Sequence, residues 1–480
     1  MAHPTMKSLK TQSLLYFLPS VFNWTLPLVM LPITTLILNP DDFGKYALVT
    51  AVTTFGTALA SLASGYIIFN NYSAIDHKNR QWMISTMLVV GMIILLVFAS
   101  IVGMLSLLSV ILTELLPQER SLYLGISLLS IIFSFPWTAL SNNIITLEQN
   151  AEIFSKVTIV LTLLHALILI FLLLVARFKT MSLFLADAIT NFFYCVISLV
   201  LLKSLLRPDI SKHWLKKILI DGFVMTIPNL VASVQSYIER VFISKYAGMD
   251  QLGIYMHSKR YVTILGPAMK SVGRSVWPQT LQYARENNRT FPITMQTWNL
   301  LYSIITIAGI AFITFGKEFI ALLTHNKFTS AYMLAVLWFI HLLCQNMQQP
   351  QLGILYGRGH GKLYSNMHLA ALCLSMMGII LTVPHIGPIG VFVSFMIQEL
   401  FFRFSITLFC WKKYAQPSFD YWAWLGLFWL SITFTLCTHF NNITGARFGI
   451  GGLSMALYCL VARRHLNQIL KLFPARKSKV

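Results

Sequence analysis

Long apolar runs alternate with short polar segments over almost the whole chain. A helix needs about 20 mostly apolar residues to cross a bilayer, and runs of this length recur along the sequence. We predict about fourteen spans, at residues 14–38, 44–69, 82–112, 122–147, 156–176, 181–203, 218–243, 251–283, 293–316, 330–356, 363–383, 388–411, 421–440 and 446–463. The last two runs are the shortest, and twelve spans is the alternative count. The pattern predicts an all-α polytopic membrane protein.

The composition agrees with this prediction. Of 480 residues, 56% are hydrophobic and only 11% are charged, whereas roughly a quarter of the residues of a soluble domain are charged. These values exclude an ordinary cytoplasmic enzyme, a coiled coil and a disordered chain. The predicted loops are short, and the longest outer loop covers residues 317–329. No room is left for a catalytic domain outside the membrane, so the function must be performed within the bilayer.

The net charge of +20 would suggest a nucleic-acid partner in a soluble protein. Here most lysines and arginines fall in loops on one side of the predicted membrane, with clusters at residues 203–217 and 463–479. Cytoplasmic loops carry such an excess, and cationic loops lie against anionic lipid headgroups. The charge pattern therefore predicts cytoplasmic N- and C-termini and contact with membrane lipids, with no nucleic-acid partner.

Residue types that bind metals show no organised pattern. The six cysteines are scattered singly without a C-x-x-C pair, and the twelve histidines form no H-E-x-x-H motif. Scattered cysteines in apolar stretches usually pack as small hydrophobic side chains. The sequence predicts neither a metal site nor a disulfide framework.

A short motif occurs twice. Residues Asp41–Tyr46 and Asp250–Tyr255 both read D-x-[FL]-G-x-Y, and they are 209 residues apart, as are Pro19 and Pro228. This separation equals six predicted spans, and many transporters are built from such repeats. We predict two six-helix lobes related by pseudo-two-fold symmetry. The predicted divisions are an N-terminal lobe at 1–203, a C-terminal lobe at 204–411, and two additional helices with a basic tail at 412–480.

Six cations fall inside the predicted spans, where a charge costs about 2.5–3.5 kcal/mol or more unless it faces water or a partner. Lys259, Lys270 and Arg274 share one helix face over roughly 22 Å, and Arg260 flanks this face. Such a stripe suits an anionic substrate such as a lipid-linked phosphate or pyrophosphate. Snorkelling or structural pairing is the alternative. The substrate-binding candidates are Arg240, Lys259, Arg260, Lys270, Arg274 and Arg403.

Acidic residues inside the spans are fewer. We select Asp187, Glu239 and Glu399 as candidates for ion coupling, because an intramembrane acid can carry a proton or help to bind sodium. Glu239 is followed by Arg240 and Glu399 lies four residues before Arg403, so structural pairing is equally open for these two acids.

The segment Leu31–Ala47 (LPITTLILNPDDFGKYA) and its counterpart Glu239–Tyr255 (ERVFISKYAGMDQLGIY) resemble polysaccharide and O-antigen flippases of the Wzx type. These belong to the multidrug/oligosaccharidyl-lipid/polysaccharide (MOP) exporter superfamily, which has a MATE-like fold. The family usually shows Asp-Arg where this chain has Glu239-Arg240.

The resemblance implies a transporter, not an enzyme. It would carry an undecaprenyl-pyrophosphate-linked oligosaccharide across the bacterial inner membrane, from the cytoplasmic to the periplasmic leaflet, for the synthesis of lipopolysaccharide or another surface polysaccharide. The implied mechanism is alternating access driven by a proton or sodium gradient, without a cofactor. A polysaccharide polymerase and a chain-length regulator are the implied protein partners.

Three other functions remain open. A peptidoglycan-precursor flippase is the nearest. A multidrug or cation exporter of the same superfamily should have a cavity rich in acids, whereas the predicted spans hold more cations than acids. A membrane-embedded polysaccharide polymerase needs acid and base groups near a substrate-binding loop, and the short outer loops make this the least favoured alternative.

Overall fold

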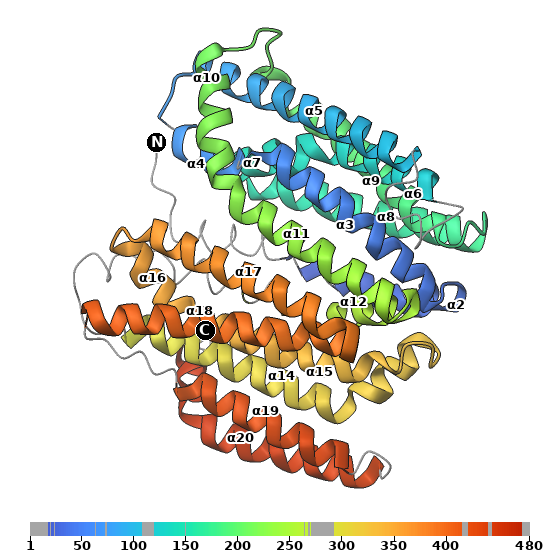
Figure 1. Cartoon of the computed structure of the whole chain (residues 1–480), viewed down its shortest axis with the longest axis vertical. Coiled ribbons are helices and arrows are strands. Elements are labelled where there is room, and N and C mark those ends of the chain that lie inside the picture. The colour runs from blue at the N-terminus through green and yellow to red at the C-terminus, as the bar shows by residue number, and fades with distance from the viewer. Residues whose placement is uncertain are drawn as a thin grey trace, which may run out of the picture. The chain divides into compact units, whose positions relative to one another are not determined.

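The computed structural model describes residues 18–19, 21–23, 25–62, 64–72, 74–107, 120–148, 150–263, 265–266, 269, 292–414, 421–439 and 444–472. Regular structure in these segments is helical throughout (Figure 1). Within them, ten helices are long and apolar enough to cross a membrane, or eleven if a bent pair is counted as one span. The all-α polytopic prediction is therefore confirmed. This count is compatible with the predicted fourteen, because the first predicted span is described with gaps, about half of the eighth lies outside the described residues, and the tenth is two short helices.

The chain forms two compact units, Met1–Met256 and His257–Val480. The first unit contains α2 (Leu31–Ile37), α3 (Pro40–Ser61), α4 (Ser64–Asn71), α5 (His77–Leu107), α6 (Arg120–Phe135), η1 (Pro136–Ser141), α7 (Asn142–Leu147), α8 (Ala151–Leu174), α9 (Met181–Leu202), η2 (Lys203–Leu205), α10 (Lys212–Lys217), η3 (Ile218–Gly222), α11 (Phe223–Tyr246) and the first residues of α12 (Met249–Thr263). The predicted division into lobes at 1–203, 204–411 and 412–480 stays a prediction.

Helix starts and breaks in this unit follow local chemistry. At the start of α3, Asn39 and Asp42 form a capping box in which the Asn39 backbone N–H donates to Asp42 at 2.8 Å, and Pro40 takes the first helical position. The helices α6 and α7 join through the π-helical turn η1, which begins at Pro136. The segment 212–222 meets 225–246 at an angle of 51°, next to the π-helical turn η3.

Packing in the first unit brings α3 beside α11, and α9 beside both α6 and α8 (Figure 1). Several large apolar side chains of α5 point outward, among them Ile93, Leu96, Val97 and Ile101. In a soluble protein such a surface would be a liability. In a multi-pass membrane protein it is the surface that contacts lipid.

The second unit contains α14 (Pro292–Thr324), α15 (Ala331–Asn346), α16 (Gln349–Gly357), α17 (Gly361–Ile386), α18 (Pro388–Tyr414), α19 (Tyr421–His439) and α20 (Thr444–Leu472), besides the end of α12. α17 and α18 form an antiparallel pair, and α14 packs against α15, α19 and α20 (Figure 1). The predicted span at 330–356 is two short helices, α15 and α16, in the structure.

The predicted outer loop at 317–329 is wrong in its extent. Helix α14 continues to Thr324 and ends where His325 and Asn326 adopt positive φ angles of 49° and 66°. A left-handed residue is a common helix terminator. The hydropathy pattern misplaced this boundary because Lys317 and Glu318 look like loop residues although they continue the helix.

Candidate functional site

The structure distributes the predicted site residues over both units. The first unit holds Asp187, Glu239 and Arg240, and the second holds Lys259, Arg260, Glu399 and Arg403. Lys270 and Arg274 lie outside the described residues. The stripe that they would form with Lys259 therefore stays a prediction.

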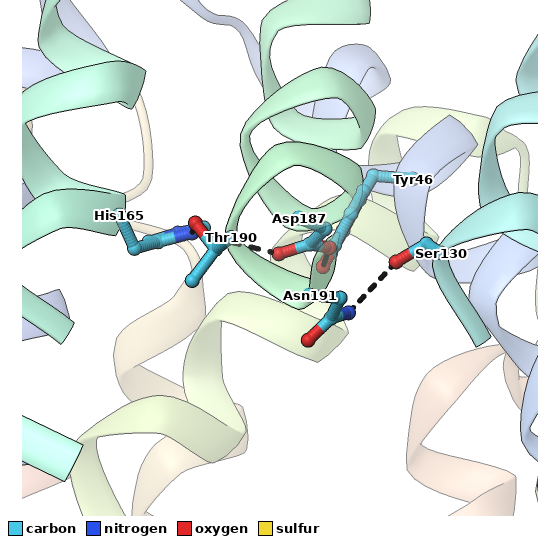
Figure 2. Close-up of polar contacts among 6 residues, drawn as sticks. All are labelled: Tyr46, Ser130, His165, Asp187, Thr190 and Asn191. Atoms are coloured by element: carbon cyan, nitrogen blue, oxygen red, sulfur yellow. Dashed lines mark hydrogen bonds and ion pairs between the residues drawn. The ribbon is translucent and has the colours of Figure 1, made fainter. Parts of the chain in front are cut away.

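Asp187 on α9 lies at the centre of a polar cluster (Figure 2). The Tyr46 hydroxyl of α3 donates to Asp187 Oδ2 at 2.5 Å, and His165 Nδ1 of α8 lies 3.8 Å from Oδ1. Both side chains of the Asp187–His165 pair remain about one third exposed. The two side chains are therefore not enclosed within the first unit.

Two further polar groups of α9 extend this cluster. Thr190 Oγ1 lies 3.3 Å from His165 Nδ1, and the Asn191 amide donates to Ser130 Oγ of α6 at 2.8 Å (Figure 2). Asp187, Thr190 and Asn191 have the i, i+3, i+4 spacing that places side chains on one helix face. One face of α9 thus presents a carboxylate, a hydroxyl and an amide to three neighbouring helices.

Glu239 on α11 is only 2% exposed. The buried Tyr255 of α12 interacts electrostatically with its carboxylate. The adjacent Arg240 points to α3, where Nη1 donates to the Ala47 carbonyl oxygen at 2.7 Å and lies 3.2 Å from Thr50 Oγ1. These contacts support a structural role for Arg240, which connects α11 to α3 by hydrogen bonds.

A second polar cluster surrounds Glu399 on α18, which is 5% exposed. The Gln348 amide donates to Glu399 Oε2 at 3.0 Å, and His341 Nε2 of α15 lies 3.9 Å from Oε1. The ring of Trp338 stands edge-on to His341 at 5.4 Å between centroids. The ammonium group of Lys259 lies 4.7 Å from the centre of the Trp338 ring, a cation–π distance. Lys259 and Glu399 were predicted for different roles, yet the structure gathers both around Trp338 and His341.

The other two candidate cations that the structure describes in the second unit, Arg403 and Arg260, lie close to aromatic groups. The Arg403 guanidinium is 5.3 Å from the centre of the Trp424 ring. Arg260 is within electrostatic range of His257 and Tyr261. Aromatic faces lower the cost of holding a cation away from water, which explains how an apolar environment tolerates these charges.

Each unit thus contains one pairing of a carboxylate with a histidine. Asp187 and Glu399 are 212 residues apart, close to the offset of 209 between the two copies of the motif, so they occupy the sixth and the twelfth predicted spans. A carboxylate beside an imidazole can exchange a proton near neutral pH. In the part of the chain that the structure describes, no group of three or more His, Cys, Asp or Glu residues could hold a metal ion.

Two histidines next to the candidate acids, and one ion pair with a buried arginine, were not found from the sequence. His165 and His341 are single polar residues in apolar runs, and nothing local distinguishes them from core histidines. Arg447 is the second residue of the predicted span 446–463; it lies in the first turn of α20, is 1% exposed, and pairs with Glu318 of α14. Only Tyr46 carried a usable signal, because it belongs to the repeated motif.

A sequence profile of the polysaccharide biosynthesis protein family matches residues 35–333. The chain belongs to this family. No curated protein matches it in sequence. Among solved structures, it is similar to the lipid II flippase MurJ in an inward closed conformation, with a TM-score of 0.64, 14% identity, and coverage of 94% of this chain and 100% of that chain.

It is also similar to an inward-facing MATE family multidrug resistance transporter of the MOP superfamily, with a TM-score of 0.62, 14% identity, and coverage of 81% of this chain and 94% of that chain. A third similar structure is a MOP superfamily transporter from Pyrococcus furiosus that is described by the reversed polarity of its binding pocket, with a TM-score of 0.53, 14% identity, and coverage of 85% and 96%. These similarities confirm the predicted MATE-like fold, and the family match confirms that the chain is a polysaccharide biosynthesis protein.

Proposed function

We propose that this protein is a flippase that moves an undecaprenyl-pyrophosphate-linked oligosaccharide from the cytoplasmic to the periplasmic leaflet of a bacterial inner membrane. Its substrate is the repeat unit of O-antigen or another surface polysaccharide, and both termini are cytoplasmic. The family match over residues 35–333 carries this proposal. The cations in the spans support it. A pyrophosphate that crosses the hydrocarbon region of the membrane needs positively charged groups to compensate its own charge.

Alternating access in this proposal is driven by protons. The groups next to the two candidate carboxylates are hydrogen-bond donors, namely the Tyr46 hydroxyl at Asp187 and the Gln348 amide at Glu399. A neighbouring histidine further suits a site that gains and loses a proton.

The test is transport of a labelled lipid-linked oligosaccharide by the purified protein in vesicles with an imposed proton or sodium gradient. We expect flux with the proton gradient and loss of flux with an uncoupler. Flux that follows only sodium would overturn proton coupling, and no flux of any lipid-linked oligosaccharide would overturn the proposed function.

Removal of charge at Lys270 and Arg274 tests the substrate stripe. Lys270→Gln and Arg274→Gln should block surface polysaccharide in cells that lack the chromosomal gene, while the protein stays inserted in the membrane. Lys156→Gln is the matched control, because Lys156 is exposed and pairs only with Glu152 one helical turn away. Normal surface polymer from the stripe variants would contradict the substrate role.

The same vesicle assay tests the alternative substrate, a peptidoglycan precursor. Both lipids carry the pyrophosphate, so the cations alone do not distinguish them. Competition between the two lipids for one transporter measures the preference directly, and a preference for the peptidoglycan precursor would reassign the substrate.

A further inference from the structure

The two copies of the D-x-[FL]-G-x-Y motif meet in space. The first copy lies at the start of α3 and the second at the start of α12. A Cβ atom on Gly44 would lie 2.2 Å from the Met249 carbonyl oxygen, and a Cβ atom on Gly253 would lie 1.8 Å from the Pro40 carbonyl oxygen. Neither position has room for any side chain.

This contact is reciprocal. Pro40 precedes Gly44 by four residues, and Met249 precedes Gly253 by four residues. Each glycine therefore touches the backbone of the other copy at the equivalent position. A pair of equivalent segments that touch in this way is related by a local two-fold axis.

The tyrosines of the motif connect this contact to acidic groups. Tyr46 follows Gly44 by two residues and donates to Asp187, and Tyr255 follows Gly253 by two residues and interacts with Glu239. In both copies the glycine permits backbone contact; the tyrosine of the first copy donates a hydrogen bond to Asp187, and the tyrosine of the second lies within electrostatic range of Glu239.

We propose that the backbone contact of Gly44 with Met249 and of Gly253 with Pro40 is a closing contact of the transport cycle, linked through Tyr46 and Tyr255 to the carboxylates of Asp187 and Glu239. The inference rests on the proposed alternating-access function. It adds two positioning glycines and a physical connection between closure and the charge state of the two acids.

Rigidity is the reason to assign a closing role to this contact. At Gly44 and Gly253 the two backbones approach so closely that no side chain fits between them, so no flexible side chain can adjust and the contact either forms or breaks. Packed elements with two discrete arrangements are the units from which conformational switches are built. Because the Gly44–Met249 and Gly253–Pro40 contacts are equivalent, both can break in the same movement.

Alanine substitution tests the contact. Gly44→Ala and Gly253→Ala should each prevent closure, because the added methyl group would overlap a carbonyl oxygen, and transport should fall severalfold or be lost. Gly125→Ala is the matched control: Gly125 also lies within a helix, α6, and nothing lies within 4 Å of its added Cβ atom. Normal transport by both motif variants would overturn the proposal.

A reporter separates loss of closure from loss of folding. Ala47 lies three residues after Gly44 on the same face of α3 and is 2% exposed, so Ala47→Cys in a background without the six natural cysteines reports on opening. We expect impermeant maleimide added to intact cells to label this cysteine severalfold faster in the Gly44→Ala and Gly253→Ala variants than in the Gly125→Ala control. Equal labelling would overturn the closing role.

The same reporter with both native glycines gives a measurement that does not depend on how the alanine variants fold. Labelling of Ala47→Cys should change when an uncoupler collapses the proton gradient, and the change should disappear with Asp187→Asn or Glu239→Gln. Constant labelling would overturn the link between closure and the acids. This readout needs no lipid-linked substrate, so a failure of the proposed function leaves it intact and the two failures are distinguishable.

Discussion

His341 Nε2 lies 3.9 Å from Oε1 of Glu399, and both side chains are less than one tenth exposed. A buried carboxylate of this kind is costly unless neighbours or a proton compensate its charge. The Gln348 amide supplies one hydrogen bond, and the histidine offers a second proton donor or acceptor. We expect the charge of Glu399 to change during transport if the protein is coupled to protons.

Glu399→Gln should abolish transport driven by a proton gradient while it preserves exchange of substrate between the two sides. The amide keeps the shape of the side chain but has no proton to release. Driven uptake and exchange without a gradient are measured in the same vesicles. Glu152→Gln, a change at an exposed acid, is the control, and driven uptake by Glu399→Gln at the native rate would contradict the assignment.

Tyr46→Phe should destabilise the protein by about 1.5–3 kcal/mol, the usual worth of a hydrogen bond to a charged group. The change removes the hydroxyl that donates to Asp187 and leaves the ring in place. Thermal unfolding in detergent measures the loss. If the hydrogen bond is the cause, Asp187→Asn combined with Tyr46→Phe should cost less than the two single changes added together.

Lys259→Gln should raise the substrate concentration needed for half-maximal transport, because the variant loses a cation next to Trp338. Lys259→Arg keeps the charge and the cation–π contact, so it should restore most of the affinity. Concentration dependence of flux in vesicles distinguishes the two variants. An unchanged half-maximal concentration in Lys259→Gln would remove Lys259 from the substrate path.

Glu318→Ala should destabilise the protein more than Arg447→Met does. Loss of Glu318 leaves the guanidinium of Arg447, which is 1% exposed, buried without its partner, and breaking a buried pair in this way costs about 3–5 kcal/mol. Loss of Arg447 leaves Glu318, whose side chain is 45% exposed and can be hydrated. Thermal unfolding of both variants in detergent measures the two losses of stability. A larger loss for Arg447→Met than for Glu318→Ala would contradict this explanation.

The pattern of apolar residues predicted most of the membrane helices, because a helix that crosses the bilayer needs an apolar run of a minimum length and such runs can be recognised in the sequence. Boundaries were less accurate where a helix continues past charged residues, as α14 does beyond Lys317 and Glu318. A charge that is paired across helices looks the same in the sequence as a charge in a loop. Glu318 of α14 and Arg447 of α20 form such a pair.

The candidate acids could be predicted because a charge in an apolar run is conspicuous. Their partners could not, because His165 and Tyr46 lie 22 and 141 residues from Asp187, and only the packing of α3, α8 and α9 brings them together. The repeated motif predicted the duplication of the chain. That the two copies touch each other could not be inferred from their spacing.

The reciprocal contact of the two motif copies also bears on the origin of this chain. Each copy supplies both the glycine that receives a neighbouring backbone and the carbonyl oxygen that approaches the other glycine. A single ancestral six-helix protein with one motif would already hold everything needed to pair with a second copy of itself through this surface. If the predicted two-lobe organisation is right, the present chain corresponds to a homodimer whose subunits have been fused, with the contact between its two motif copies in place of a contact between subunits.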